Sequence, residues 1–205
     1  MIRVGIIGGA GYTAGEMLRV LLNHPEVEIA FVNSSSNAGN KLYDVHEGLF
    51  GETELTFTDQ LTFNEIDALF ICSGHGDSKK FLEAHESEIP ASVKIIDLSQ
   101  DYRNESCGFV YGLPEVNRER IRKATRLANP GCFATAVQIG LLPLAANGLI
   151  KGEVHTNGIT GSTGAGVKPG ATSHFSWRNN NMSIYKAFTH QHLLEITQTM
   201  RQLQP

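Results

Sequence analysis

A cysteine next to a glycine carries the clearest chemical signal in the sequence. Cys132 follows Pro130 and Gly131 and precedes a long apolar stretch, so it should lie where a strand ends and a helix begins. A sulfur at the N-terminal end of a helix is favoured as the reactive thiolate, because the helix dipole stabilises negative charge there. We therefore predict that Cys132 is a nucleophile.

The other two cysteines carry weaker signals. Cys72 ends an apolar run and is best explained as a small buried hydrophobic residue, whereas Cys107 lies in a polar loop and receives no role. Three thiols cannot all pair within one chain, and the N-terminal residues lack the pattern of a secretory signal. We therefore expect reduced thiols and a cytoplasmic protein.

A glycine-rich turn near the N-terminus is typical of a dinucleotide site. Residues 8–15 read Gly-Gly-Ala-Gly-Tyr-Thr-Ala-Gly and separate an apolar run at 2–7 from a helical pattern at 13–23. The spacing departs from the strict Gly-x-Gly-x-x-Gly pattern, but its place between strand and helix predicts that it binds a pyrophosphate. The cofactor contacts are expected from Gly8, Gly11, Tyr12, Thr13 and Ala14.

The segment after the second predicted strand, at 27–32, favours NADP over NAD. NAD sites place a carboxylate there for the ribose hydroxyls, whereas residues 33–37 read Asn-Ser-Ser-Ser-Asn. Hydroxyls suit a 2′-phosphate better than an acid does, although this segment holds no arginine. The cofactor is therefore expected to contact Ser34, Ser35 and Ser36, with Ser73 and His75 at its edge; a helix cap is the alternative role for His75.

Apolar runs alternate with helical patterns along residues 1–150. This alternation predicts an α/β, Rossmann-like domain: a parallel sheet with helices on both faces. The nearly uncharged helix expected at 133–146 should be buried. Further strands are expected at 67–72, 93–96 and 126–128, and further helices at 78–86 and 115–124.

From residue 151 the composition shifts towards Gly, Ser, Thr, Asn and His. We interpret residues 151–205, with a last helix near 191–202, as the start of an α+β substrate or dimerisation domain. Such a segment is too short to close its own sheet, so we expect the chain to be a truncated piece of a longer protein.

Composition and charge exclude several classes of protein. Hydrophobic residues make up 41% of the chain and charged residues 19%, as in a globular protein. A net charge of −4 and a pI near 6.1 offer no basic field for nucleic acid or an anionic membrane. We expect neither partner, and no apolar stretch is long enough to span a bilayer.

The residues around Cys132 resemble a known family signature. Asn-Pro-Gly-Cys-Phe-Ala-Thr-Ala at 129–136, followed by Gly-Leu-Leu-Pro at 140–143, is similar to N-acetyl-gamma-glutamyl-phosphate reductases. Residues 185–192, with Glu195, resemble the second catalytic segment of that family. Four more segments agree in order: residues 8–15, Asp-Leu-Ser-Gln-Asp-Tyr-Arg at 97–103, Tyr-Gly-Leu-Pro-Glu at 111–115, and Gly-Ser-Thr-Gly-Ala-Gly-Val-Lys-Pro at 161–169.

This resemblance implies NADPH-dependent reduction of an acyl phosphate to a semialdehyde, with phosphate release, in arginine biosynthesis. The Cys132 thiolate would form a thioester, and His190 would serve as the acid–base group. A homo-oligomer, dimer or tetramer, is also implied. The N-acyl group stays open, with acetyl the family default and succinyl the alternative.

The resemblance also implies residues that hold the substrate and its phosphate. His192 and Glu195 are three apart, so a helix would place them on one face to orient the substrate or His190. A metal site is the alternative for these side chains, although the chemistry needs no metal. The other predicted substrate residues, each with a solvated polar loop as the alternative, are Arg103, Ser162, Thr163, Gly164, Lys168, Ser173, His174 and Tyr185.

Two other functions remain open. An aspartate-semialdehyde dehydrogenase shares the cysteine-based chemistry, but residues 185–192 and Phe133 argue against it. A non-catalytic NADP-binding sensor would need neither a cysteine at a helix start nor a histidine segment.

Overall fold

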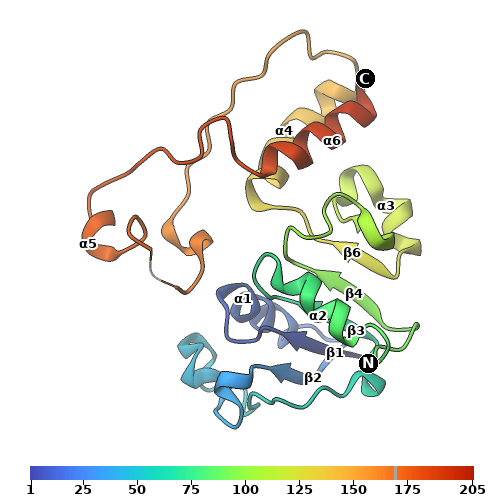
Figure 1. Cartoon of the computed structure of the whole chain (residues 1–205), viewed down its shortest axis with the longest axis vertical. Coiled ribbons are helices and arrows are strands. Elements are labelled where there is room, and N and C mark those ends of the chain that lie inside the picture. The colour runs from blue at the N-terminus through green and yellow to red at the C-terminus, as the bar shows by residue number, and fades with distance from the viewer. Residues whose placement is uncertain (169) are drawn as a thin grey trace. The chain divides into compact units, whose positions relative to one another are not determined.

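The computed structural model describes residues 1–168 and 170–205, which form two compact units, Met1–Asn129 and Pro130–Pro205 (Figure 1). This division differs from the predicted one at residue 150. Helix α4 (Cys132–Ala146) packs against α6 (His192–Leu203), so it joins the second unit and not the first. Pro169, the last residue of the glycine-rich motif, lies outside the described residues.

A parallel six-stranded sheet forms the first unit, with its strands in the order β2-β1-β3-β4-β6-β5. The predicted Rossmann-like class is confirmed. Strand β5 has only two residues, which is too short for any periodicity to reveal it in the sequence. The strands are β1 (Ile2–Ile7), β2 (Val27–Asn33), β3 (Ala68–Ile71), β4 (Lys94–Asp97), β5 (Val110–Tyr111) and β6 (Arg126–Ala128).

Helices cover both faces of the sheet, as predicted. Successive strand residues point to opposite faces, so each strand contributes to two cores. Ile6 belongs to the buried cluster that includes Leu18 of α1 (Tyr12–Leu21), whereas Ile7 belongs to the cluster that includes Leu82 of α2 (Asp77–His85). Helix α3 (Pro114–Lys123) packs on β5.

Between β2 and β3 the chain makes an excursion that has no long helix. Four 3₁₀ turns lie there: η1 (Ser35–Asn37), η2 (Leu42–Asp44), η3 (Glu47–Leu49) and η4 (Phe63–Glu65). Leu42, Leu49 and Phe57 are buried in the cluster that contains α1. Two of these turns, η2 and η3, together with Phe57 thus take the place of a covering helix, and the sequence pattern did not predict them.

The strand order brings two turns to the same edge of the sheet. Strand β1 pairs with β2 on one side and β3 on the other, so the turns that follow β1 and β3 are neighbours. Open parallel sheets bind ligands at such a point, outside the carboxyl ends of the strands. The glycine turn of residues 8–15 and the segment from Ser73 to Gly76 meet there.

The second unit consists of the α4–α6 pair and the long connection between them. Gln204 closes this connection, because its amide donates to Ile150 O at 2.8 Å and accepts from Ile150 N at 3.3 Å. In its described residues the connection holds η6 (Ser162–Ala165) and α5 (Phe175–Arg178), and residues 130–168 and 170–205 contain no strand. The expected α+β domain is therefore represented by helices.

The prediction that the whole of residues 133–146 is buried was wrong. Helix α4 buries one stripe, which includes Gln138 and Leu142, while Ile139 and Leu144 are exposed. One packing partner, α6, covers only one side of a helix, so the opposite apolar side faces outward.

Within the described part of the chain, none of the helices has the length and apolar character needed to cross a membrane.

The central strand offers a test of the core. Leu69 is fully buried in β3, so Leu69→Ala should lower the free energy of unfolding by about 2–5 kcal/mol, measured by urea denaturation. Val20→Ala is the control, since Val20 is exposed on α1 and its truncation should change stability by less than about 0.5 kcal/mol. Equal effects of the two changes would contradict the sheet assignment.

Candidate functional site

Close backbone packing shapes the glycine turn after β1. Gly8 has φ +74°, and a Cβ atom there would lie 3.0 Å from backbone atoms of Cys72 and Ser73. At Gly9 a Cβ atom would lie 2.4 Å from Val32 Cγ1. Only glycine lets the turn sit this close to the ends of β2 and β3.

The two helix N-termini at this edge differ in how they are capped. The carboxylate of Asp101 accepts from Gly76 N at 2.8 and 3.0 Å and from Lys79 N at 3.1 Å, which caps α2. Helix α1 follows Gly11, which makes no side-chain cap. An anionic ligand therefore fits the N-terminus of α1, where Tyr12 and Thr13 are exposed and Ala14 is buried.

The serines after β2 are arranged around one amide. Asn37 Nδ2 donates to Ser34 Oγ at 3.0 Å and to Ser36 Oγ at 3.1 Å. Ser34 is buried, whereas Ser35 and Ser36 are exposed at η1. Ser35 and Ser36 are thus the accessible members of the predicted 2′-phosphate set, while Ser34 shapes the turn.

His75 is exposed beside the glycine turn, and half-buried Ser73 lies against Gly8. Gln100 N donates to His75 Nδ1 at 3.1 Å, so a neutral imidazole carries its proton on Nε2. The alternative role as a helix cap does not fit, because Gly76 is the N-cap of α2 and Asp101 accepts its N–H.

Arg103 supports the backbone, which argues against the predicted binding of phosphate. Its side chain is buried, and it donates from Nε to Asn129 O at 2.9 Å and from Nη2 to Leu98 O at 3.2 Å. These bonds tie the loop after β4 to the residue that follows β6. A guanidinium that donates to backbone carbonyls in this way fixes a loop, and its paired N–H donors are not directed at a phosphate.

The predicted nucleophile is the first residue of α4. Cys132 is exposed, and the turn before it is held from two sides. Gly131 N donates to the buried carboxylate of Glu195 at 2.9 Å, while Gly131 O accepts from Thr135 Oγ1 at 2.9 Å. The helix start that carries the sulfur is therefore fixed by α6, 64 residues further along the chain.

Two histidines of the second unit lie against this turn. The rings of His190 and His192 are 4.4 Å apart, and Phe133 packs on both of them. A Cβ atom on Gly131 would lie 2.3 Å from His192 Nε2, so glycine there makes room for the imidazole. His192 Nε2 is 3.9 Å from Glu195 Oε1 and both residues are buried, which places them behind the cysteine turn and not on a substrate surface.

His190 is half-buried and has a defined tautomer. His192 N donates to His190 Nδ1 at 3.1 Å, so neutral His190 carries its proton on Nε2. Burial and the nearby Lys186 cation lower the pKa of His190, and the Glu195 carboxylate opposes them. A low pKa keeps the ring neutral near pH 7.

Tyr185 links the histidines to the cysteine. Its ring is 5.7 Å from that of His190, and burial together with the charge of a Cys132 thiolate raises the pKa of the phenol. Tyr185, His190 and Cys132, three of the predicted site residues, therefore form one group of side chains.

Cys72 differs sharply from Cys132. Burial, with a smaller contribution from the Asp97 carboxylate, raises the pKa of the Cys72 thiol to about 12. Asp97 is itself fully buried and accepts from Ser78 Oγ at 2.5 Å and Ser99 Oγ at 2.7 Å. Cys72 is half-buried, and its high pKa fits the predicted unreactive thiol.

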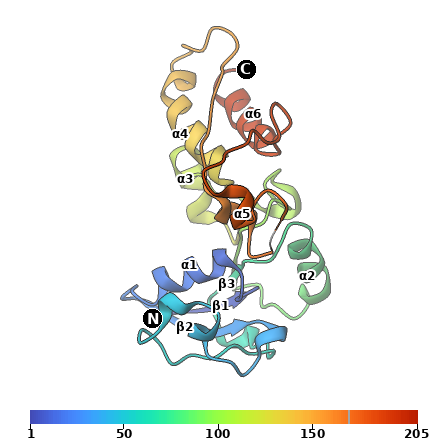
Figure 2. The ribbon, with the colours of Figure 1, turned by 90° about the vertical axis from the view of Figure 1, so that its left-hand side faces the viewer.

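The predicted phosphate loop lies apart from the cysteine within the second unit. Figure 1 shows the segment that carries α5 away from the α4–α6 pair, and Figure 2 shows the same elements turned by 90°. Ser173 bonds only locally among the described contacts, to Gly170, and His174 caps α5. Among the described residues, the hydrogen bonds, ion pairs and ring contacts do not join Cys132 to the predicted residues Ser162, Thr163, Gly164, Lys168, Ser173 and His174, although Gly158 of the same connection lies against Phe133.

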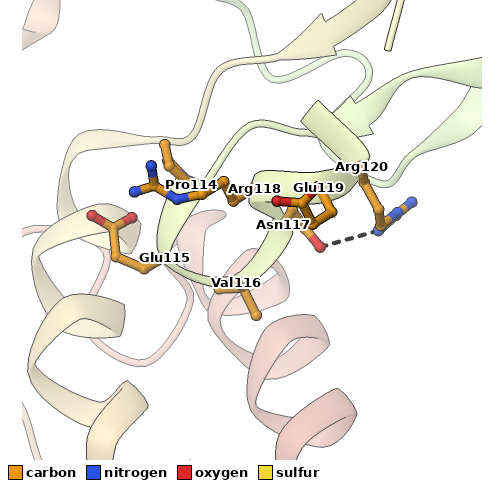
Figure 3. Close-up of a pocket in the computed structure, with 7 residues that line it drawn as sticks. All are labelled: Pro114, Glu115, Val116, Asn117, Arg118, Glu119 and Arg120. Atoms are coloured by element: carbon orange, nitrogen blue, oxygen red, sulfur yellow. Dashed lines mark hydrogen bonds between the residues drawn. The ribbon is translucent and has the colours of Figure 1, made fainter. Parts of the chain in front are cut away.

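Two surface hollows lie outside this group. One, of about 290 Å³, is lined by consecutive residues of α3, Pro114–Arg120 (Figure 3). The other, of about 600 Å³, is lined by residues 170–177 and includes His174. The α3 hollow contains none of the predicted site residues, so we do not assign it to the active site.

The metal alternative gains no support from the geometry. Among residues 1–168 and 170–205, no group of three His, Cys, Asp or Glu side chains is placed to hold a metal ion.

Sequence reasoning did not predict several residues that shape the glycine turn and the cysteine turn. Gly131 and Phe133 stand beside Cys132, and that position was the available signal. Asp101 and His46 gave no signal, because the hydrogen bonds of their side chains join residues at least 22 positions apart. His46 Nε2 donates to Gly9 O at 2.7 Å, directly beneath the glycine turn.

Family models match both units. Residues 3–124 match the model described as semialdehyde dehydrogenase, NAD binding domain, and residues 132–205 match the one described as semialdehyde dehydrogenase, dimerisation domain. The chain belongs to the semialdehyde dehydrogenase family.

Relatives with closely similar sequences carry one name. The N-acetyl-gamma-glutamyl-phosphate reductases of Bacteroides thetaiotaomicron and Phocaeicola vulgatus are 66% and 64% identical to the chain, over 100% of its length. The enzyme of that name from Christiangramia forsetii is 54% identical over the same share. The chain spans 63% of the length of each of these relatives.

Solved structures share the fold at low sequence identity. An aspartate semialdehyde dehydrogenase II from Vibrio cholerae superimposes with a TM-score of 0.53 at 22% identity, over 70% of this chain and 46% of that one. The enzyme from Candida albicans, solved with NADP, gives 0.55 at 19% identity, over 73% and 48%. At this level the likeness concerns the fold alone.

Thiol labelling separates the three cysteines. At pH 8, iodoacetamide should modify exposed Cys132 and Cys107 in the folded protein and leave Cys72 intact, because its pKa lies near 12. Mass spectrometry of peptides counts the labels, and Cys132→Ser should remove one. Labelling of Cys72 before the protein unfolds would contradict the shielded, high-pKa thiol.

The titration of His190 tests the charges around it. In an NMR titration, His190 should have a pKa below the ordinary value of 6.5. Lys186→Met removes a cation that disfavours the imidazolium, so it should move the pKa upward. An unchanged or lower pKa in this variant would show that Lys186 does not act on the ring.

Proposed function

We propose that the whole protein reduces N-acetyl-gamma-glutamyl phosphate to N-acetylglutamate semialdehyde with NADPH and releases phosphate, a reaction of arginine biosynthesis. The observation that best supports this function is the exposed Cys132 at the start of α4, on a turn that Glu195 and Thr135 hold in place. The name shared by relatives at 54–66% identity supports the substrate.

The residues of the first unit fit a dinucleotide. The glycines after β1 let backbone approach backbone, and α1 begins without a side-chain cap. Gly8, Gly11, Tyr12, Thr13 and Ala14 would hold the pyrophosphate, and the exposed Ser35 and Ser36 would meet the 2′-phosphate of NADP. When bound, NADPH supplies the hydride of the reaction.

Cys132 begins the chemistry. Its thiolate attacks the acyl carbon of the substrate, a C–S bond forms, and the C–O bond to phosphate breaks, so phosphate leaves with its electron pair. After hydride addition, the tetrahedral intermediate collapses to the aldehyde, and the C–S bond returns its electrons to the Cys132 sulfur. The thiolate is regenerated for the next cycle.

His190 best serves as a hydrogen-bond donor. Its Nδ1 accepts the His192 N–H, so Nε2–H of the neutral ring is the group available to an acyl oxygen that gains negative charge. This role modifies the prediction that His190 takes the thiol proton, because an Nε2 that carries a proton cannot accept one. Buried His192 and Glu195 act as positioning residues for the turn and the ring.

Two alternatives are less well supported. Aspartate-semialdehyde dehydrogenases share the fold at 22% identity or less among the neighbours described, far below the 54–66% of the reductases. A non-catalytic sensor leaves unexplained the buried Glu195 and the histidine pair arranged around Cys132.

The remaining partners are also part of the proposal. A second copy of the chain, in a dimer or tetramer, is supported by the match to a dimerisation domain. The free thiols of all three cysteines support a cytoplasmic location. The acetyl group is supported by the names of the relatives, and an N-succinyl substrate is the alternative.

Replacing the nucleophile tests the proposal. In protein expressed from the complete open reading frame, we expect phosphate-dependent reduction of NADP with N-acetylglutamate semialdehyde. Cys132→Ser should abolish this turnover and leave the NADP dissociation constant within about twofold, because the glycine turn belongs to the other unit. Absorbance at the reduced nicotinamide band follows the reaction, and Cys107→Ser is the matched control.

Each outcome has a definite meaning. Turnover that persists in Cys132→Ser would exclude the thioester route. Wild-type protein that binds NADP but turns over neither the N-acetyl nor the N-succinyl substrate would favour the sensor.

A further inference from the structure

We propose that His46, in the excursion between β2 and β3, is the positioning residue that orients the glycine turn for its anionic ligand. The inference rests on the proposed function, since it concerns how the same turn receives the phosphates of NADP. It assigns a role in cofactor binding to a residue 37 positions away from the turn in sequence.

A short hydrogen bond carries the inference. His46 Nε2 lies 2.7 Å from Gly9 O, and a carbonyl oxygen only accepts, so Nε2 must carry the proton. The same glycine donates its N–H to Asn33 O at 2.8 Å. Gly9 is therefore held at both its backbone groups, by the end of β2 and by His46.

The ring is fitted to the first turn of α1. A Cβ atom on Gly15 would lie 2.7 Å from His46 Nδ1 and 2.9 Å from Cε1. The last glycine of the motif is thus explained by the imidazole that occupies this space. Phe57 also packs near the imidazole, with its ring centre 6.1 Å from that of His46.

The backbone of His46 is also fixed. His46 N donates to Leu42 O at 2.9 Å, and Leu49 N donates to His46 O at 2.8 Å. Leu42 and Leu49 are buried in the cluster that contains α1. The 3₁₀ turns of the excursion therefore place a rigid imidazole beneath the glycine turn.

Peptide geometry connects this contact with the ligand. The bond between Gly9 and Ala10 is trans and planar, so Ala10 N–H points opposite to Gly9 C=O. When His46 holds the carbonyl inward, the N–H is directed outward, to the side from which a phosphate approaches. If this peptide rotated, the carbonyl oxygen would face the anion and repel it.

A pair of substitutions separates the hydrogen bond from packing. His46→Gln keeps an N–H donor at about the reach of Nε2, and His46→Leu keeps most of the volume but has no donor. Loss of a partly buried hydrogen bond of this kind weakens binding by about tenfold. We expect His46→Leu to raise the NADP dissociation constant by at least that factor, and His46→Gln to restore it to within about threefold of wild type.

The measurement uses full-length protein and fluorescence titration with NADP, with thermal unfolding of the free protein recorded alongside. His24→Leu is the control, because His24 is exposed in the loop before β2 and bonds only locally to Glu26 N. Equal NADP affinity in His46→Leu and wild type would overturn the proposal.

A second readout needs no cofactor. In ¹⁵N-labelled protein, long-range ¹H–¹⁵N correlations should show His46 as the Nε2–H tautomer. The Nδ1–H tautomer would overturn the proposal even if NADP binds. Wild-type protein that shows the Nε2–H tautomer but binds no NADP would instead overturn the proposed function, so the two failures are distinguishable.

Discussion

The approach of backbone to backbone at Gly8 is the constraint on which the nucleotide edge depends. With φ +74° and no side chain, this residue lets the turn after β1 pack directly on the end of β3. The neighbouring strand order then brings Ser73 and His75 to the same edge. A larger residue would push the turn away from the sheet and take the start of α1 with it. Binding at this edge is therefore a property of main-chain packing before it is a property of any side chain.

In the second unit, a carboxylate fixes the turn that carries the functional residue. Glu195 accepts from Gly131 N and so fixes the residue before Cys132, while Gly131 leaves room for the His192 ring. The cost of burying the carboxylate is offset by this hydrogen bond and by the nearby imidazole. The nucleophile stays exposed because the groups that position it lie behind it.

Local sequence patterns predicted those features whose causes are local. The Gly8–Gly15 turn, the helix start at Cys132 and the inert Cys72 each follow from neighbouring residues. His46, Asp101 and the bonds of Arg103 depend on which distant segments meet, and a single sequence does not encode that visibly. The short 3₁₀ turns of the excursion escaped prediction for a related reason, since they bury Leu42 and Leu49 without any helical period. Helix α4 was expected to be buried because composition records hydrophobicity but not the number of packing partners.

The amide of Gln204 has a consequence for how this family can vary. By bonding to both backbone groups of Ile150, it joins the end of α6 to the chain that follows α4, and the segment between them becomes a closed loop. The entropy of closing such a loop grows only with the logarithm of its length, by about 0.6 kcal/mol per doubling. Insertions and deletions between the two helices therefore change the free energy of folding only slightly. Evolution can therefore change the length of the connection between α4 and α6 while the cysteine turn, held by Glu195, stays in place.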